Sequence, residues 1–240
     1  MNYNNHDFEE VVQRGRGWDL AEAYPVLMRK VYLWMTLALV ITGATAYGVA
    51  TTPSILMAIA TNKILFFGLI IAEFGLVIGL SSALNRLSLT TATLMFVVYS
   101  VINGATLSFI FLAYTMSSIT SVFFITAATF AVMSVIGLTT KADLTSLGKL
   151  LFMALIGLII ATVVNIFIGS TGMQMIISYV GVLIFVGLTA YDSQKIKQML
   201  AEAGDTGEVG QKLALIGALS LYLDFVNLFL YLLRIFGKRE

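Results

Sequence analysis

Four charged side chains lie within or at the ends of long apolar stretches of this sequence. Glu73 and Asp224 stand well inside such stretches, and Arg86 and Asp192 stand at the ends of two of them. A charge costs about 2.5 to 3.5 kcal/mol in the hydrocarbon of a membrane, so each is a candidate functional group. Carboxylates are hard ligands that suit calcium, and two of them close together in a low dielectric titrate as a coupled pair. The residues therefore indicate chemistry with protons and hard cations.

Each of these residues also has a structural interpretation. Asp192 could mark the interface where a span leaves the membrane, Glu73 could be protonated and hydrogen-bonded for packing, and Arg86 suits an anchor at a membrane surface. Asp224 is the hardest to explain in this way, because it belongs to a polar stripe with spacings of three and four residues. The members of the stripe are Gly217, Ser220, Asp224, Asn227 and Tyr231. Such a stripe cannot face lipid, so we expect this helix inside a bundle.

The composition is that of an integral membrane protein. Of 240 residues, 59% are hydrophobic and only 11% are charged, and the mean hydropathy is +0.93. The 14 basic and 13 acidic side chains are too few to cover a water-facing surface of this size, which excludes a soluble enzyme. No cysteine and one histidine, His6, exclude disulfides, thiol nucleophiles and zinc sites, and we expect no cofactor. The net charge of +1 gives no basic field, so nucleic acid is not expected as a partner.

Seven apolar stretches are long enough, at roughly 20 residues each, to cross the hydrocarbon core as helices. They cover approximately residues 31–50, 64–84, 91–112, 119–138, 150–168, 174–191 and 214–233. We therefore predict an all-α membrane protein, with residues 1–25 as a polar N-terminal tail and residues 26–240 as a seven-span transmembrane domain. Only one connection is long, from Ser193 to Leu213.

The distribution of basic residues predicts the orientation. Basic residues in short connections mark the cytosolic side of a membrane protein. If the N-terminal tail is cytosolic, most of the 14 basic residues lie on the cytosolic side, so we predict a cytosolic N-terminus. Seven full spans place the basic C-terminal segment outside, whereas a re-entrant last segment would return it inside. Charge counting does not choose between the two. We expect seven full spans, because the last stretch is long and has neither proline nor glycine after Gly217.

Two motifs carry a family resemblance. The sixth stretch closes with Ala190, Tyr191 and Asp192, and the seventh contains the run LYLDFVNLFL from Leu221 to Leu230. From about Tyr24 onward, the chain resembles the bacterial branch of the Bax-inhibitor family of membrane proteins. That resemblance implies six helices wrapped around a central C-terminal helix, a pH-sensitive calcium leak through the bundle, and a place in the bacterial inner membrane.

The same resemblance implies roles for individual residues. The two pore aspartates of the family fall on Asp192 and Asp224, which would sense pH and bind calcium transiently as it permeates. The arginine that latches the pair falls on Arg86, and Glu73 resembles the acidic residue of the second span, a candidate carboxylate on the calcium path. A shared proton would link the last two spans, and its loss would cause repulsion that the arginine could offset.

The polar stripe adds Ser220 and Asn227 as supporting residues beside the pair. Counting residues at 1.5 Å each places the two aspartates at depths that differ by about 10 Å, which helix tilt or offset span ends must close.

Two functions of other classes compete with the channel. An intramembrane aspartyl protease also uses two aspartates, and Tyr191-Asp192 fits its first motif, but its second motif needs glycine where this chain has Tyr222. We therefore do not expect an enzyme. A non-conducting regulator would act in a stress response by binding other membrane proteins. The expected partners of the channel are the lipid bilayer and calcium ions, and the regulator would add other membrane proteins to them. Calcium flux in pure lipid separates the two, because a regulator alone would pass none.

Overall fold

The computed structural model describes residues 5–84, 86–203 and 206–239, with side chains from Tyr24 onward, and the regular elements within these ranges are all helices. The helices are α1 (Asn5–Ala50), α2 (Pro53–Thr61), α3 (Lys63–Ala83), α4 (Leu89–Leu107), α5 (Ile110–Ala113), α6 (Met116–Thr139), α7 (Thr145–Ile168), α8 (Thr171–Ala203) and α9 (Glu208–Phe236). Seven stretches of the described chain are long and apolar enough to span a membrane, with α4 and α5 forming one of them together. The predicted all-α membrane fold is therefore confirmed.

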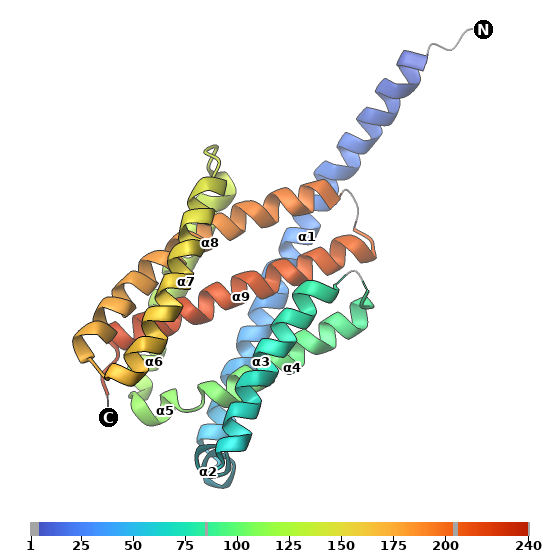
Figure 1. The fold of residues 1–240 in the computed structure, drawn as a ribbon. Coiled ribbons are helices and arrows are strands. Elements are labelled where there is room, and N and C mark those ends of the chain that lie inside the picture. Colours follow the sequence, from blue (N-terminus) through green and yellow to red (C-terminus); the bar gives the residue numbers. More distant parts are fainter. Residues whose placement is uncertain (1–4, 85, 204–205, 240) are drawn as a thin grey trace.

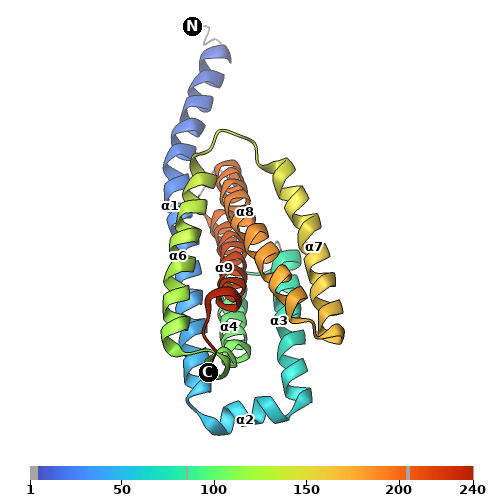
Figure 2. The same cartoon turned by 90° about the vertical axis from the view of Figure 1, so that its left-hand side faces the viewer.

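The last helix, α9, lies at the centre of the bundle. It packs directly against α1, α4, α6 and α8, whereas α3 and α7 lie further out, against α4 and α8 (Figures 1 and 2). Its Leu215, Leu221 and Leu228 are completely buried, and α9 is the most deeply buried of the seven spans. The outer helices α3 and α7 leave most of their apolar side chains exposed, as helices that face lipid do. The expected central position of the C-terminal helix is therefore confirmed.

Glycine allows the helices around α9 to approach closely. A Cβ atom at Gly137 of α6 would lie 2.1 Å from the carbonyl oxygen of Ala190 in α8, and one at Gly181 of α8 would lie 2.7 Å from the ring of Tyr231. Neither position accepts a larger side chain without moving a neighbour. Small residues let helix backbones meet in this way in membranes, where packing rather than the hydrophobic effect holds helices together.

Helix α8 is longer than the sequence indicates. It runs to Ala203, and α9 begins at Glu208, so most of the connection predicted from Ser193 to Leu213 is helical and that prediction is wrong. The physical reason is an apolar stripe, because Ile196 and Leu200 are buried one turn apart below the buried Ser193. The charged residues of this stretch lie between the stripe positions and do not interrupt the helix.

Helix α1 extends far beyond the predicted first span. It is continuous from Asn5 to Ala50 and includes Pro25, and its N-terminal part projects from the bundle (Figure 1). The stretch suited to crossing the membrane begins at Tyr24. The predicted tail, residues 1–25, therefore continues into the first span without a break from residue 5, while residues 1–4 lie outside the described part of the chain.

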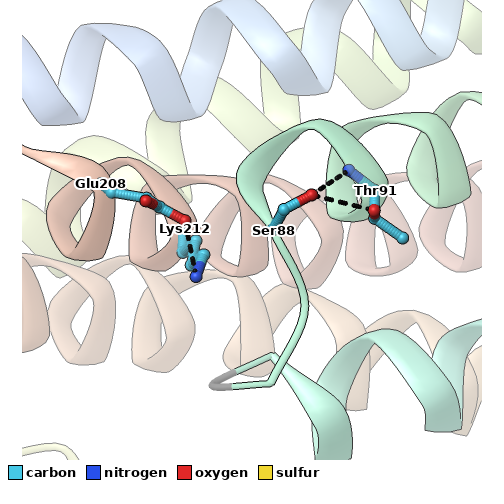
Figure 3. A network of polar contacts seen from close by, with 4 residues as sticks. All are labelled: Ser88, Thr91, Glu208 and Lys212. Carbon is cyan, nitrogen blue, oxygen red and sulfur yellow. Dashed lines mark hydrogen bonds and ion pairs between the residues drawn. The ribbon is translucent and has the colours of Figure 1, made fainter.

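The starts of α4 and α9 lie together at one end of the bundle, and a side-chain cap fixes where α4 begins. The hydroxyl of Ser88 accepts a hydrogen bond from the backbone N–H of Thr91 at 3.1 Å, which caps α4. Beside it, an ion pair of 2.8 Å joins Glu208 and Lys212 at the start of α9 (Figure 3). The backbone N–H of Leu89 also interacts with the Glu208 carboxylate. A carboxylate at a helix N-terminus is stabilised by the helix dipole, which favours the charged form of Glu208 at this position.

Candidate functional site

The two aspartates predicted from the sequence lie on neighbouring helices that pack along their length. Helices α8 and α9 are separated only by residues 204–207. Asp192 lies 11 residues before the end of α8, and Ser220 lies 12 residues after the start of α9, so the two are level. The Ser220 hydroxyl donates a hydrogen bond of 2.9 Å to Oδ2 of Asp192. Ser220, predicted to support the pair, therefore contacts one member of it directly.

Asp224 lies one turn further along α9, about 6 Å from the level of Ser220 at 1.5 Å per residue. It is only 4% exposed, and it is close enough to Asp192 for the two charges to interact. Its Oδ2 is the one buried side-chain polar atom in the described chain that has no hydrogen-bond partner. The two aspartates therefore differ in depth by about 6 Å, less than the difference of about 10 Å expected from the sequence.

Arg86 and Asn227, predicted to lie around the pair, do not bond to either aspartate within the described residues. Arg86 is exposed in the connection between α3 and α4, and no ion pair joins it to either aspartate within residues 5–84, 86–203 and 206–239. The basic residue whose charge reaches Asp192 is Lys195, one turn further along α8. The side chain of Asn227 donates to the carbonyl oxygen of Leu223 in its own helix at 2.8 Å. The latch role of Arg86 stays a prediction.

A second polar cluster, which we call the Tyr222 cluster, lies on another face of α9. It consists of Thr42 of α1, Glu73 of α3, Asn103 and Thr106 of α4, and Tyr222 of α9. The Tyr222 hydroxyl donates to Oδ1 of Asn103 at 2.9 Å and lies 2.7 Å from the Thr42 hydroxyl. The Thr106 hydroxyl donates to Oε1 of Glu73 at 2.6 Å, and the Asn103 side chain also bonds to Glu73. A continuous set of hydrogen bonds therefore joins four helices.

Of the Tyr222 cluster, the sequence singled out only Glu73. Tyr222 entered the prediction only because it replaces the glycine of a protease motif. Asn103 and Thr106 are three residues apart in an apolar stretch, a spacing that puts two polar groups on one helix face. That spacing was the available signal, but it does not tell which other helix supplies the partners.

The residues after Asp192 hold the connection between α6 and α7. Gln194 donates from Nε2 to the carbonyl oxygen of Ala142 at 2.8 Å and accepts from the backbone N–H of Leu144 at 2.9 Å. The ammonium group of Lys197 donates to the carbonyl oxygen of Leu138 at 2.8 Å. One turn of α8, from Gln194 to Lys197, is therefore hydrogen-bonded to the end of α6 and to the connection after it. A movement of α8 at Asp192 would displace this connection.

The connection itself carries one exposed acidic residue, Asp143. A hydrogen bond from the Thr145 hydroxyl and a second from its backbone N–H hold the pKa of Asp143 below its ordinary value. This carboxylate is therefore charged at neutral pH and caps the start of α7.

The arrangement suits brief contact with a cation better than permanent binding. Calcium prefers six to eight oxygen ligands in a stable site. Within the described residues, no three histidine, cysteine, aspartate or glutamate side chains lie close enough together to hold a metal ion. An ion at Asp192 and Asp224 would be held by two carboxyl groups and the Ser220 hydroxyl, which favours passage over retention.

Comparison with known proteins places the whole membrane domain in one group. Residues 25–240 match the family described as inhibitor of apoptosis-promoting Bax1. The inner membrane protein YbhL of Escherichia coli K12 is 47% identical over 215 residues, which cover 89% of this chain and 92% of YbhL. An uncharacterized protein of Borreliella burgdorferi is 47% identical over 213 residues, with the same coverage of 89% and 92%. An uncharacterized membrane protein of Streptococcus pyogenes serotype M1 is 45% identical over 186 residues, covering 77% of this chain and 80% of its own.

Proposed function

Since this chain belongs to the Bax-inhibitor family of membrane proteins, we propose that it is a pH-sensitive calcium leak channel gated by Asp192 and Asp224. The similarity to an inner membrane protein of Escherichia coli supports a bacterial inner membrane as its location. The observation that carries the proposal is the buried Oδ2 of Asp224, which has no hydrogen-bond partner within the described residues and lies near a second carboxyl group. Nothing in this proposal requires an enzymatic activity.

The gating step follows from the electrostatics of the pair. Two carboxylates in a low dielectric cannot both be charged cheaply, so a proton held between them links α8 to α9. When the proton leaves, the two charges repel, and the proposed proton-mediated link between Asp192 and Asp224 is lost. The Ser220 hydroxyl, which donates a hydrogen bond to Asp192, then stabilises the charged Asp192 carboxylate. Calcium, a hard cation, is attracted to the charged pair and passes along the face of α9 that carries it.

The direct test is calcium flux into liposomes that contain only the purified protein and lipid. An internal calcium dye is read over a series of pH values, with empty liposomes as the baseline. Flux that changes with pH, and that loses this dependence in the Asp192→Asn, Asp224→Asn double variant, supports the proposal. Unchanged pH dependence in the inserted double variant would overturn the gate. A wild-type protein that passes no calcium at any pH would instead support the non-conducting regulator.

The two single variants test whether the aspartates act as one unit. Each of Asp192→Asn and Asp224→Asn should flatten the pH dependence, and the double variant should add little, because groups in contact do not contribute additively. Additive effects of the two substitutions would show that the carboxyl groups titrate independently.

The proposed latch is tested at Arg86. If Arg86 pairs with the deprotonated aspartates in the open state, Arg86→Ala should change flux mainly at the higher pH values. The matched control is Lys63→Ala, which removes an exposed basic residue at the start of α3. Equal effects of both substitutions, or an effect of Arg86→Ala only at low pH, would contradict the latch.

The proposed orientation, with the N-terminal tail in the cytosol, has its own test. Reporter fusions after Trp18 and within residues 204–210 should report the cytosolic side together, because six spans separate them. Reports from opposite sides would refute the orientation.

A further inference from the structure

A cleft with a volume of about 420 Å³ lies between α1 and α6. Its walls include Leu39 of α1 and Ala127 of α6, and its floor is Phe225 of α9. A smaller cavity of about 100 Å³ continues along the same two helices and shares Leu39, Phe123 and Phe225 with the first. The two spaces therefore lie next to each other against the central helix, and the volume of the larger one is in the range of small-molecule sites.

The residues of α1 and α6 that line the cleft lie in stretches that are long and apolar enough to span a membrane. Its lining is almost wholly apolar, and the exceptions include the hydroxyls of Tyr32 and Ser134, which hydrogen-bond to each other across it. At this depth the surroundings of a membrane protein are hydrocarbon chains. An empty apolar space forfeits the dispersion contacts of its lining atoms, so a chain that enters it gains contacts on several sides.

Basic residues stand at one end of the cleft. Arg29 is exposed and lies three residues before Tyr32 and seven before Thr36, which puts it on the lining face of α1. Lys141 is exposed and follows the lining residue Leu138 by three residues, at the same end. A positive charge beside an apolar cleft complements a molecule with a hydrocarbon chain and an anionic head.

We propose that this cleft binds one acyl chain of an anionic phospholipid, whose headgroup pairs with Arg29. The chain packs on Phe225, whose ring lies 5.4 Å from the ring of Phe123 and 5.5 Å from that of Phe130 between centroids. Phe225 follows Asp224 directly, so the bound lipid contacts α9 beside the aspartate pair. This site depends on the α1, α6 and α9 surfaces alone and not on the proposed channel activity.

Native mass spectrometry of the purified protein with phosphatidylglycerol or phosphatidylcholine of identical acyl chains measures the binding. Ala127→Trp fills the cleft and should weaken retention of phosphatidylglycerol about tenfold, since the bulky ring takes the place of the chain. The matched control is Ala128→Trp, because Ala128 is exposed and does not line the cleft. Should Ala127→Trp not fold, Ala131→Leu fills the same cleft more gently. Equal retention by the cleft variant and the control would overturn the site.

The headgroup contact is tested separately. Arg29→Gln should lower the preference for phosphatidylglycerol over phosphatidylcholine about fivefold, as expected for one ion pair. Equal retention of phosphatidylglycerol and phosphatidylcholine by the wild type would overturn the proposal that the bound headgroup is anionic.

Phosphatidylglycerol with a photoreactive acyl chain locates the site. Cross-links should concentrate on α1, α6 and Phe225 and disappear in Ala127→Trp but not in Ala128→Trp. Cross-links spread evenly over the exposed faces of α3 and α7 would overturn the proposal.

Discussion

The two polar faces of α9 differ in how completely their groups are hydrogen-bonded. Towards α8, Asp224 has a buried carboxyl oxygen without a partner, next to a second carboxyl group. Towards α1 and α4, Tyr222 is fully buried and both donates to Asn103 and contacts Thr42. The two residues are separated by two positions, about 200° around one helix. On opposite sides of α9, one face therefore has its buried polar groups hydrogen-bonded, the satisfied face, and the other has a buried carboxyl oxygen without a partner, the unsatisfied face.

This difference shows what each face is suited to do. A buried polar network whose members are all bonded rigidifies a bundle, whereas an unsatisfied buried group stores a cost that a proton or a cation can relieve. The Tyr222 cluster is thus suited to hold α1, α3, α4 and α9 together. The aspartate pair is suited to respond to a change in charge. The predictions below test this division.

The largest expected effect is the loss of pH dependence on the aspartate face only. In liposomes, the Asp192→Asn, Asp224→Asn double variant should show nearly equal calcium flux across the pH series. Tyr222→Phe should keep the pH dependence of the wild type, because it leaves the pair unaltered. A flattened profile in Tyr222→Phe would show that the two faces are coupled rather than separate.

The next effect concerns stability on the satisfied face. Tyr222→Phe removes one hydroxyl and leaves Oδ1 of Asn103 without its donor, which should lower the free energy of unfolding by about 1 to 3 kcal/mol. Thermal unfolding in detergent measures this as a lower Tm. The control is Tyr179→Phe, an exposed tyrosine of α8, which should leave Tm unchanged. Equal Tm values for both variants would show that the cluster does not stabilise the fold.

On the unsatisfied face, replacing a carboxyl group should raise the free energy of unfolding instead of lowering it. Asp224→Asn removes a buried charge and supplies an amide that can donate to Asp192, so it should raise the free energy of unfolding by about 1 kcal/mol. The rise should be seen at high pH, where repulsion within the pair is strongest, and should shrink as the pH falls. A lower Tm at every pH would mean that the carboxyl group of Asp224 is stabilising after all.

The smallest effect is expected at Ser220. Ser220→Ala removes one hydrogen bond to Asp192, and side-chain hydrogen bonds between membrane helices contribute about 0.6 kcal/mol on average. Tm should therefore fall slightly, while the pH profile of calcium flux should shift without flattening, because both carboxyl groups remain. A flattened profile would give Ser220 a larger part in proton binding than the geometry implies.

The sequence predicted the spans and the interior position of α9 because both depend on patterns within one segment. A run of apolar residues identifies a span, and the stripe of Ser220, Asp224 and Asn227 identifies the helix that avoids lipid. The extension of α8 was missed because its charged residues outnumber the buried Ile196 and Leu200 that hold the stretch in the bundle.

Partners across the bundle were less accessible to sequence analysis. The spacing of Asn103 and Thr106 marks a polar face on α4, but only the packing shows that Glu73 and Tyr222 meet it. Arg86 illustrates the opposite case. A family resemblance assigned it a partner, and the structure places it in an exposed connection, since the resemblance carries a role but not the position of a side chain.

The central place of α9 also constrains how the protein is made. The ribosome delivers residues 208–236 after residues 24–203, so the six other spans enter the membrane before the helix that fills their centre. Until then, surfaces such as those of α4 and α8 that later cover α9 must be occupied by lipid or by one another. Biogenesis therefore ends with a helix that carries Asp224 leaving the lipid to pack against α1, α4, α6 and α8.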